Sequence, residues 1–259
     1  SRDADVDKSS EIDPTQRLAR SDGRSPRALL SSSFADELAV RYQGKSRIFA
    51  VSVKDRGAIP LAGSSGKAFW FSKATGTFVT SNFFYYAYPD LVSAWKDSGK
   101  LDAYANRAWE LLNDPASYQG LSPDDSPWET NFPGFSRAFP HNWGDRDSKY
   151  FTTLLTVSPA GDELTLDFAK ALLENEQLGQ DNVPDYLAIS FSSTDYVGHV
   201  FGPSSLEAED NLLRLDRTLA RLIKAVGDKV GLSVGDNVGL SVGDKVGLSV
   251  GLRDRNSVG

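Results

Sequence analysis

The sequence predicts an α/β fold, in which short buried strands are combined with amphipathic helices. Two apolar runs, residues 46–53 and 187–191, have the length and the β-branched and aromatic composition of buried strands. After residue 204, leucines recur at helical spacing along a long segment that is otherwise polar. Strands and helices in one chain are typical of a sheet that helices cover.

The composition indicates a globular, acidic protein. The chain has 259 residues, of which 40% are hydrophobic and 24% charged, enough for one large α/β domain or two small ones. The net charge of −7 argues against nucleic acid as the main partner, because nucleic-acid backbones bind basic surfaces. No apolar run approaches the roughly 20 residues of a membrane helix. We therefore expect neither a nucleic-acid nor a membrane partner.

Cysteine and methionine are both absent from the sequence. Without cysteine there can be neither a disulfide framework nor a thiolate metal site. The lack of an initiator methionine is typical of a processed product, a domain excised from a longer chain, or a sequence numbered from an internal point. No signal peptide is present, which is compatible with an exported mature chain.

The first third of the chain contains a polar segment, a helix and three strands. Residues 1–27 are polar and charged, and we expect them to be extended or mobile. Residues 28–42 predict a helix with Ser33 as its N-cap, and the strand at 46–53 follows. Two short apolar runs within residues 68–80 flank a turn that contains glycine, which predicts a β-hairpin.

The middle of the chain is expected to combine helices with a long irregular segment. Residues 91–98 and 103–113 have helical spacing. Residues 114–149 are rich in Pro, Gly, Asp and Trp and contain one of the two histidines, which is typical of a functional or lid-like segment. Residues 151–157 predict a strand, and residues 166–173 predict a helix.

The last helix is predicted to begin with a capping box, formed by Ser204 and Glu207. It ends where residues 226–249 repeat an eight-residue unit, VGDKVGLS or VGDNVGLS. Calcium-binding β-rolls also contain Gly-Asp repeats, but their units are nine residues long, so a flexible or loosely β-like tail is the favoured interpretation. The folded domain is therefore expected at residues 28–225 and the tail at residues 226–259.

A candidate metal site directly follows the strand at residues 187–191. Asp195 and His199 are four residues apart, so their side chains face each other if the segment is helical. A carboxylate and an imidazole suit a divalent transition ion, zinc above all. Open α/β sheets bind their ligands beyond the carboxyl ends of the strands. The alternative is a solvated acid beside a hydrogen-bonded histidine, which is common for such an isolated pair.

A candidate phosphate site follows the strand at residues 46–53. Lys54 and Arg56 occupy alternate positions, so they point the same way if the chain is extended. Arginine can bind a phosphate or sulfate through two bonds, and lysine supplies a point charge. The alternative is ordinary surface charge.

Three blocks of sequence, in order, resemble one enzyme family. They read SVKDRGAIPLAG, AFPHNW and AISFSSTDYVGHVFGPSSLEAEDNLLRLD, and the similarity runs from about residue 25 to about residue 225. The chain resembles the alkaline phosphatase superfamily, in its phosphate-monoesterase branch, which is often labelled type I phosphodiesterase or nucleotide pyrophosphatase-like.

The resemblance implies a mostly parallel sheet flanked by helices and a mechanism with two zinc ions. Asp195 and His199 would bind one zinc, and Lys54 and Arg56 would contact the transferred phosphoryl group. A Thr or Ser nucleophile would form a phospho-enzyme that water then hydrolyses. The family also implies a small-molecule phosphate ester as substrate and a periplasmic or secreted location.

The sequence departs from the family pattern at both ends. The family's nucleophile and one Asp ligand belong upstream of residue 1, so the nucleophile is unknown here. A later Asp-His pair is replaced by the repeat, and no histidine follows His199. An incomplete sheet exposes strand edges, which predicts a homo-oligomer or pairing with another chain.

Three functions therefore remain open. The first is a metal-dependent hydrolase of phosphate monoesters. The second is a truncated, inactive relative that keeps part of the metal and phosphate sites. The third is a hydrolase of phosphodiesters, sulfate esters or carboxylic esters.

Overall fold

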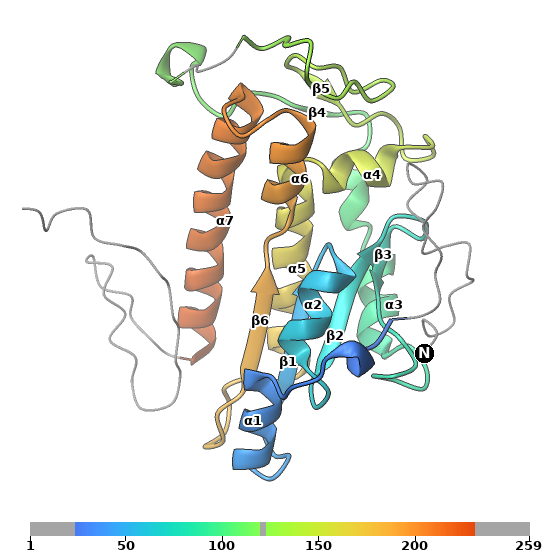
Figure 1. Ribbon diagram of the computed structural model, residues 1–259, viewed down its shortest axis with the longest axis vertical. Helices are drawn as coiled ribbons and strands as arrows, with labels where there is room; N and C mark the ends of the chain where they lie inside the picture. Colours follow the sequence, from blue (N-terminus) through green and yellow to red (C-terminus); the bar gives the residue numbers. More distant parts are fainter. Residues whose placement is uncertain (1–23, 120–122, 231–259) are drawn as a thin grey trace, which may run out of the picture.

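The computed structural model describes residues 24–119 and 123–230, which are coloured in Figure 1. Its main sheet has four strands in the order β3-β2-β1-β6. Strand β1 lies in the middle, parallel to β2 on one side and to β6 on the other, and β3 is antiparallel to β2. The strands are β1 (Ile48–Ser52), β2 (Lys67–Ser72), β3 (Thr77–Val79) and β6 (Tyr186–Ser190). The predicted α/β fold with a mostly parallel sheet is confirmed, as are the strands at residues 46–53 and 187–191.

Helices cover both faces of this sheet, as a buried parallel sheet requires. Alternate residues of β1 face opposite ways: Phe49 and Val51 join the larger core, and Ala50 joins a second core. The described helices are α1 (Phe34–Arg41), α2 (Asp55–Ala62), α3 (Asp90–Asp97), α4 (Phe151–Thr156), α5 (Pro159–Asn175), α6 (Ser193–Val200) and α7 (Leu206–Val230), with short 3-10 turns η1 (Pro26–Ala28), η2 (Lys100–Ala103) and η3 (Pro115–Ser117).

The larger core lies between the sheet and helices α3 and α5. Phe168 of α5 stacks on Phe78 of β3 with ring centroids 4.4 Å apart, and meets Phe69 of β2 at 5.2 Å. Trp95 of α3 completes the cluster against Phe78. The second core is smaller, and there α2 packs Ala58 and Ile59 on the opposite face. The apolar residues of the predicted strands thus contribute to both cores.

Several local predictions are confirmed. Ser33 caps α1 in a capping box with Asp36, and α3 matches residues 91–98. The hairpin of β2 and β3 pairs Ser72 with Thr77. The helix expected at residues 166–173 forms within the longer α5.

The strand predicted at residues 151–157 is wrong, because this segment forms α4. A short apolar run with β-branched residues cannot be distinguished from a buried helix by composition alone. One of its threonines is satisfied within helical geometry, since Thr156 Oγ1 donates to the carbonyl of Thr153. Thr152 instead donates to the carbonyl of Lys73, outside the helix.

The helix predicted at residues 103–113 is also wrong. The chain turns at Asn106, whose φ is 57°, and then forms β4 (Ala108–Trp109), which pairs antiparallel with β5 (His141–Asn142). The amide of Leu112 donates to the Asp210 carboxylate at 2.7 Å instead of to a helical carbonyl. Tertiary contacts with α7 have replaced the local helical preference.

Both ends of α7 differ from the prediction. Ser205, not Ser204, caps the helix, since its hydroxyl accepts from the amide of Ala208 at 3.1 Å. The helix also continues through Val230, so the first residues of the repeat are helical. The rest of the predicted tail lies outside the described residues.

Residues 1–23 of the predicted mobile segment are likewise outside the described part of the chain, whereas Arg24 is within it and forms an ion pair with Asp55. In the two described stretches, no helix combines the length and apolar character needed to cross a bilayer.

Candidate functional site

Three parallel strands end at one edge of the sheet, and the candidate residues follow those ends. Ser52 of β1 is level with Ser190 of β6 and with Trp70 of β2. Lys54 comes two residues after Ser52. Helix α6 continues from the tip of β6, as Figure 1 shows, and carries both Asp195 and His199. The topology thus unites residues more than 140 positions apart.

Helix α6 is held at its first turn by the two helices beside it. The Asp162 carboxylate of α5 accepts from the amide of Ser193 at 3.0 Å. Asn211 of α7 donates to the Thr194 hydroxyl at 2.8 Å. Burial raises the pKa of Asp162 to about 6, against the hydrogen bonds from Ser193 and Thr194 that lower it. These contacts fix the direction in which Asp195 and His199 point.

The helical geometry expected for Asp195 and His199 is confirmed. His199 Nε2 lies 3.4 Å from Asp195 Oδ1, and the two side chains are 77% and 58% exposed. The other Asp195 oxygen pairs with the Lys54 ammonium group. The hydrogen bond from Lys54 lowers the pKa of Asp195. Burial acts in the opposite direction, and the charges of Lys54, His199 and Arg56 lower this pKa further.

The chain is extended at Lys54 but helical at Arg56, so the condition under which the two side chains would point the same way is not met. Lys54 is the extended N-cap of α2, whereas Arg56 lies within the helix. Lys54 is only 7% exposed, and its Nζ lies 3.9 Å from the ring centroid of Tyr196. Arg56 is exposed. Both residues nevertheless follow the carboxyl end of β1, at the edge of the sheet where α6 begins.

A chain of serine hydroxyls, not anticipated from the sequence, supports Lys54. The Ser192 hydroxyl is hydrogen-bonded to those of Ser52 at 2.9 Å and Ser190 at 2.7 Å. The Ser52 hydroxyl also accepts from the amide of Lys54 at 3.0 Å. Gly57 is required beside this chain, since a Cβ there would lie 2.8 Å from the Ser52 hydroxyl. The sequence feature that could have predicted this chain of hydroxyls is the serine near the end of each predicted strand, Ser52 and Ser190.

Asp195 and His199 suit a zinc ion as two of its ligands. The carboxylate oxygen of Asp195 and the ring nitrogen of His199 lie side by side, as two ligands of one ion would. The other carboxylate oxygen already binds one cation, the ammonium group of Lys54. Within residues 24–119 and 123–230, no group of three or more His, Asp or Glu side chains is arranged to hold a metal. Asp55 is not a third ligand here, because it pairs with Arg24. A complete site would need ligands from beyond these residues.

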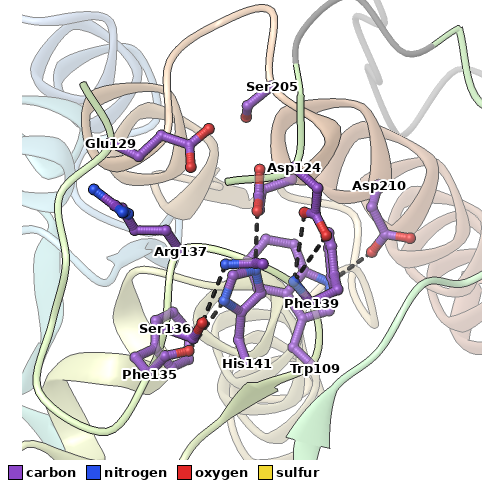
Figure 2. Close-up of polar contacts among 12 residues, drawn as sticks. Trp109, Asp124, Glu129, Phe135, Ser136, Arg137, Phe139, His141, Ser205 and Asp210 are labelled. Carbon is purple, nitrogen blue, oxygen red and sulfur yellow. Dashed lines mark hydrogen bonds and ion pairs between the residues drawn. The ribbon is translucent and has the colours of Figure 1, made fainter. Parts of the chain in front are cut away.

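The other histidine lies in a different part of the molecule. His141 is fully buried, with Nδ1 3.1 Å from the Phe135 carbonyl and Nε2 3.1 Å from a Glu207 carboxylate oxygen. Figure 2 shows its ring among Trp109, Phe135 and Phe139, with the carboxylates of Asp124 and Glu129 nearby. Both ring nitrogens are occupied within the fold, so His141 is not a candidate metal ligand.

Comparison with known proteins identifies the family of the chain. The model of the type I phosphodiesterase / nucleotide pyrophosphatase family matches residues 34–241. The chain belongs to this family. Among its relatives, alkaline phosphatase PhoV of Synechococcus elongatus is 36% identical over 209 residues, which are 80% of this chain and 38% of PhoV. A protein of Myroides odoratus named calcium-transporting ATPase is 35% identical over 80% of this chain and 39% of its own.

The family fold is also seen in a solved structure. The crystal structure of wild-type alkaline phosphatase PafA matches with a TM-score of 0.74 and 34% identity, over 80% of this chain and 40% of that chain. The chain therefore spans about two fifths of the length of the relatives that it matches. Lys54, Arg56, Asp195 and His199 all lie within the matched segment.

Proposed function

We propose that the chain carries the phosphate-binding part and half of one metal site of a zinc-dependent, alkaline phosphatase-like hydrolase of phosphate monoesters. The observation that supports this most directly is the contact between Lys54 and Asp195, which joins the two candidate sites into one. The names of PhoV and PafA support the same activity class.

The roles follow from charge and position. Lys54 and Arg56 would bind the non-bridging oxygens of the phosphoryl group, where stabilising charge contributes most to catalysis. Asp195 and His199 would hold zinc, which supplies further positive charge to the reacting oxygens. Two cations favour a dianionic monoester over a phosphodiester, a sulfate ester or a carboxylic ester, each of which carries less charge. The nucleophile is not assigned to any residue.

A second candidate is a relative that binds anions but does not turn over substrate. It is favoured by the two-ligand metal site, because zinc usually needs three or four protein ligands for tight binding. Zinc-dependent turnover separates the two candidates.

We also propose a small-molecule phosphate ester as the partner and a periplasmic or secreted location, in line with the family. Strand β6 is an edge of the described sheet, and its Leu187 and Ile189 are only partly buried. Pairing of this edge with another chain, such as a second copy, would complete the sheet. Size-exclusion chromatography with light scattering tests this, and a monomer at all concentrations contradicts it.

The test of function is hydrolysis of p-nitrophenyl phosphate with and without added zinc. The double variant Asp195→Ala with His199→Ala removes the metal ligands, and Lys54→Gln removes the buried cation. We expect zinc-stimulated hydrolysis that falls at least about 100-fold in both, since positioned charges typically contribute that much. If the unaltered chain, the double variant and Lys54→Gln hydrolyse the substrate at the same rate, or if the unaltered chain shows no hydrolysis with added zinc, phosphatase activity is contradicted and the inactive relative is favoured.

A further inference from the structure

The ion pair between Lys54 and Asp195 joins a buried cation to an exposed anion. The Lys54 side chain is almost fully buried, and its ammonium group pairs with Asp195 Oδ2. The ring centroid of Tyr196 lies 3.9 Å from the same ammonium nitrogen. A buried charge needs such partners, because it has been removed from water. Two successive residues of α6 thus supply Lys54 with a charged partner and a neutral one.

The backbone on each side of this ion pair is held in place. The amide of Lys54 donates to the Ser52 hydroxyl at 3.0 Å, at the end of β1. On α6, the amide of Ser193 donates to the Asp162 carboxylate at 3.0 Å. The pair therefore joins the end of β1 to the first turn of α6 at positions that the fold determines.

The two oxygens of Asp195 face different groups. Oδ2 contacts the Lys54 ammonium group, whereas Oδ1 lies 3.4 Å from Nε2 of His199, the other candidate metal ligand. One carboxylate therefore belongs to the candidate phosphate site through one oxygen and to the candidate metal site through the other. It carries a single negative charge, which Lys54 neutralises when no metal is bound.

A metal ion on Asp195 would change the charge that surrounds Lys54. Zinc brings two positive charges to a carboxylate with one negative charge, so the net charge beside the ammonium group changes from negative to positive. An ammonium group in such surroundings attracts an anion more strongly than one that is paired with a carboxylate. The Tyr196 ring attracts the ammonium group in both cases, because that attraction comes from the ring itself. Lys54 would therefore stay at the site with its charge available to an anion.

We propose that Asp195 is shared between Lys54 and the metal ion, so that the metal and the phosphoryl group bind cooperatively. Without metal, Asp195 competes with phosphate for Lys54. With metal on Asp195, this competition is removed. Because such coupling is reciprocal, bound phosphate strengthens metal binding by the same factor. This inference rests on the proposed function, because it describes the regulation of the same site.

The first test measures, by calorimetry at low ionic strength, orthophosphate binding to the whole chain after a chelator has removed metal. Asp195→Asn replaces the carboxylate with a neutral amide of the same shape, and so removes the competitor of phosphate. We expect the orthophosphate affinity to rise about tenfold, the value of one charged hydrogen bond. The same change made in Lys54→Gln should alter the affinity less than about twofold, because the effect acts through Lys54.

Asp228→Asn is the matched control. Asp228 also pairs with a lysine, Lys224, at 2.8 Å, and the variant changes the net charge of the chain by the same amount. This pair is exposed and lies in the last turns of α7, at the end of the sheet away from α6 (Figure 1). We expect its orthophosphate affinity to change less than about twofold. An equal rise in both variants would mean that net charge alone is responsible, and would overturn the inference.

The second test adds zinc and uses sulfate as the anion, because zinc phosphate is poorly soluble. We expect zinc to raise the sulfate affinity of the unaltered chain at least about fivefold, and to leave that of Asp195→Asn unchanged. No rise of orthophosphate affinity in Asp195→Asn, or no effect of zinc on sulfate affinity, would overturn cooperative binding. Orthophosphate binding that is lost in Lys54→Gln would then still support the proposed function. If neither the unaltered chain nor Asp195→Asn binds orthophosphate, both proposals fail.

Discussion

The chain has two histidines, and each lies beside a carboxylate in a very different setting. His199 and Asp195 are 3.4 Å apart and mostly exposed at the edge of the sheet. His141 and Glu207 are 3.1 Å apart and have no exposed surface. The same pair of residue types thus forms a candidate ligand site in one place and part of the interior in the other. Burial, rather than residue type, separates the two roles.

The hydrogen bonds of His141 show why the buried pair cannot serve a ligand. The Phe135 carbonyl can only accept, so Nδ1 of His141 carries a proton. The contact from Nε2 to Glu207 then requires one further proton, held by either partner. Aromatic rings surround the imidazole; those of Phe139, Phe201 and Trp109 lie between 4.5 and 5.2 Å away. Nothing in this arrangement leaves a lone pair for a metal.

Glu207 and Asp210 together attach the first two turns of α7 to the segment around β4 and β5. Asp210 is fully buried and accepts from Trp109 Nε1 at 2.6 Å, the Leu112 amide at 2.7 Å and Arg214 Nε at 2.6 Å. The bonds from Trp109 and Leu112 join the segment around β4 and β5 to the helix. The buried carboxylates therefore stabilise tertiary structure, whereas Asp195 is available for chemistry.

The largest effect is expected from the buried side of this comparison. Asp210→Ala leaves several buried donors without an acceptor, and removing one partner of a buried charged network typically costs about 3–5 kcal/mol. Urea denaturation measures this loss. Asp216→Ala is the control, since Asp216 is exposed on the same helix, and we expect a change within about 0.5 kcal/mol. Similar losses in both variants would contradict the role of Asp210.

The two histidines provide the next test. His141→Ala should lower the free energy of unfolding by about 2–4 kcal/mol, because it opens a cavity and leaves buried polar groups unpaired. His199→Ala should change it by less than about 0.5 kcal/mol, because the side chain is 77% exposed. Thermal and urea unfolding of both variants check this. Equal free energies of unfolding for His141→Ala and His199→Ala would mean that the buried pair of His141 and Glu207 does not stabilise the fold.

A smaller effect is expected from pH. Burial raises the pKa of Glu129 to about 7, with hydrogen bonding from Ser126 opposing it and the charges of Glu207 and Asp124 adding to it. As the pH falls, Glu129 therefore binds a proton at a higher pH in the folded state than in the unfolded state, where the pKa of Glu is about 4.3. The free energy of unfolding should rise as the pH falls from 8 through 7 to about 5. The exposed Asp195, with its lowered pKa, does not contribute to this rise.

Glu129→Gln tests the assignment of that pH dependence. The variant has no titrating group at this position, so its urea midpoint should vary less between pH 8 and 6 than that of the unaltered chain. Asp124 and Asp162, whose pKa values burial raises to about 6, would account for the part that remains at lower pH. Parallel pH profiles for the two proteins would contradict the assignment to Glu129.

The local sequence pattern predicts those helices and strands in which the spacing of apolar residues matches the face that is buried. The strands β1 and β6 and the helices α3 and α5 are of this kind. It failed where contacts from distant segments decide the conformation. Residues 103–113 resemble a helix, but the bond from Leu112 to Asp210 spans 98 positions.

The candidate site shows the same limit. The spacing of Asp195 and His199 is local, so their geometry could be predicted. Ser52 and Ser192 meet across 140 positions, and His141 and Glu207 across 66. The spacing of Glu207 from Ser204 predicts a capping box, yet Glu207 is buried against His141. Such pairings depend on the topology, which periodicity does not contain.

One measurement compares the two pairs directly. The nitrogen-15 NMR signals of the two imidazoles can be followed while zinc is added to the folded chain, with His199→Ala used to assign them. We expect zinc to shift or broaden the His199 signals and to leave those of His141 unchanged. A shift confined to His141, or no shift of either histidine, would contradict the assignment of the exposed pair as the metal-binding site.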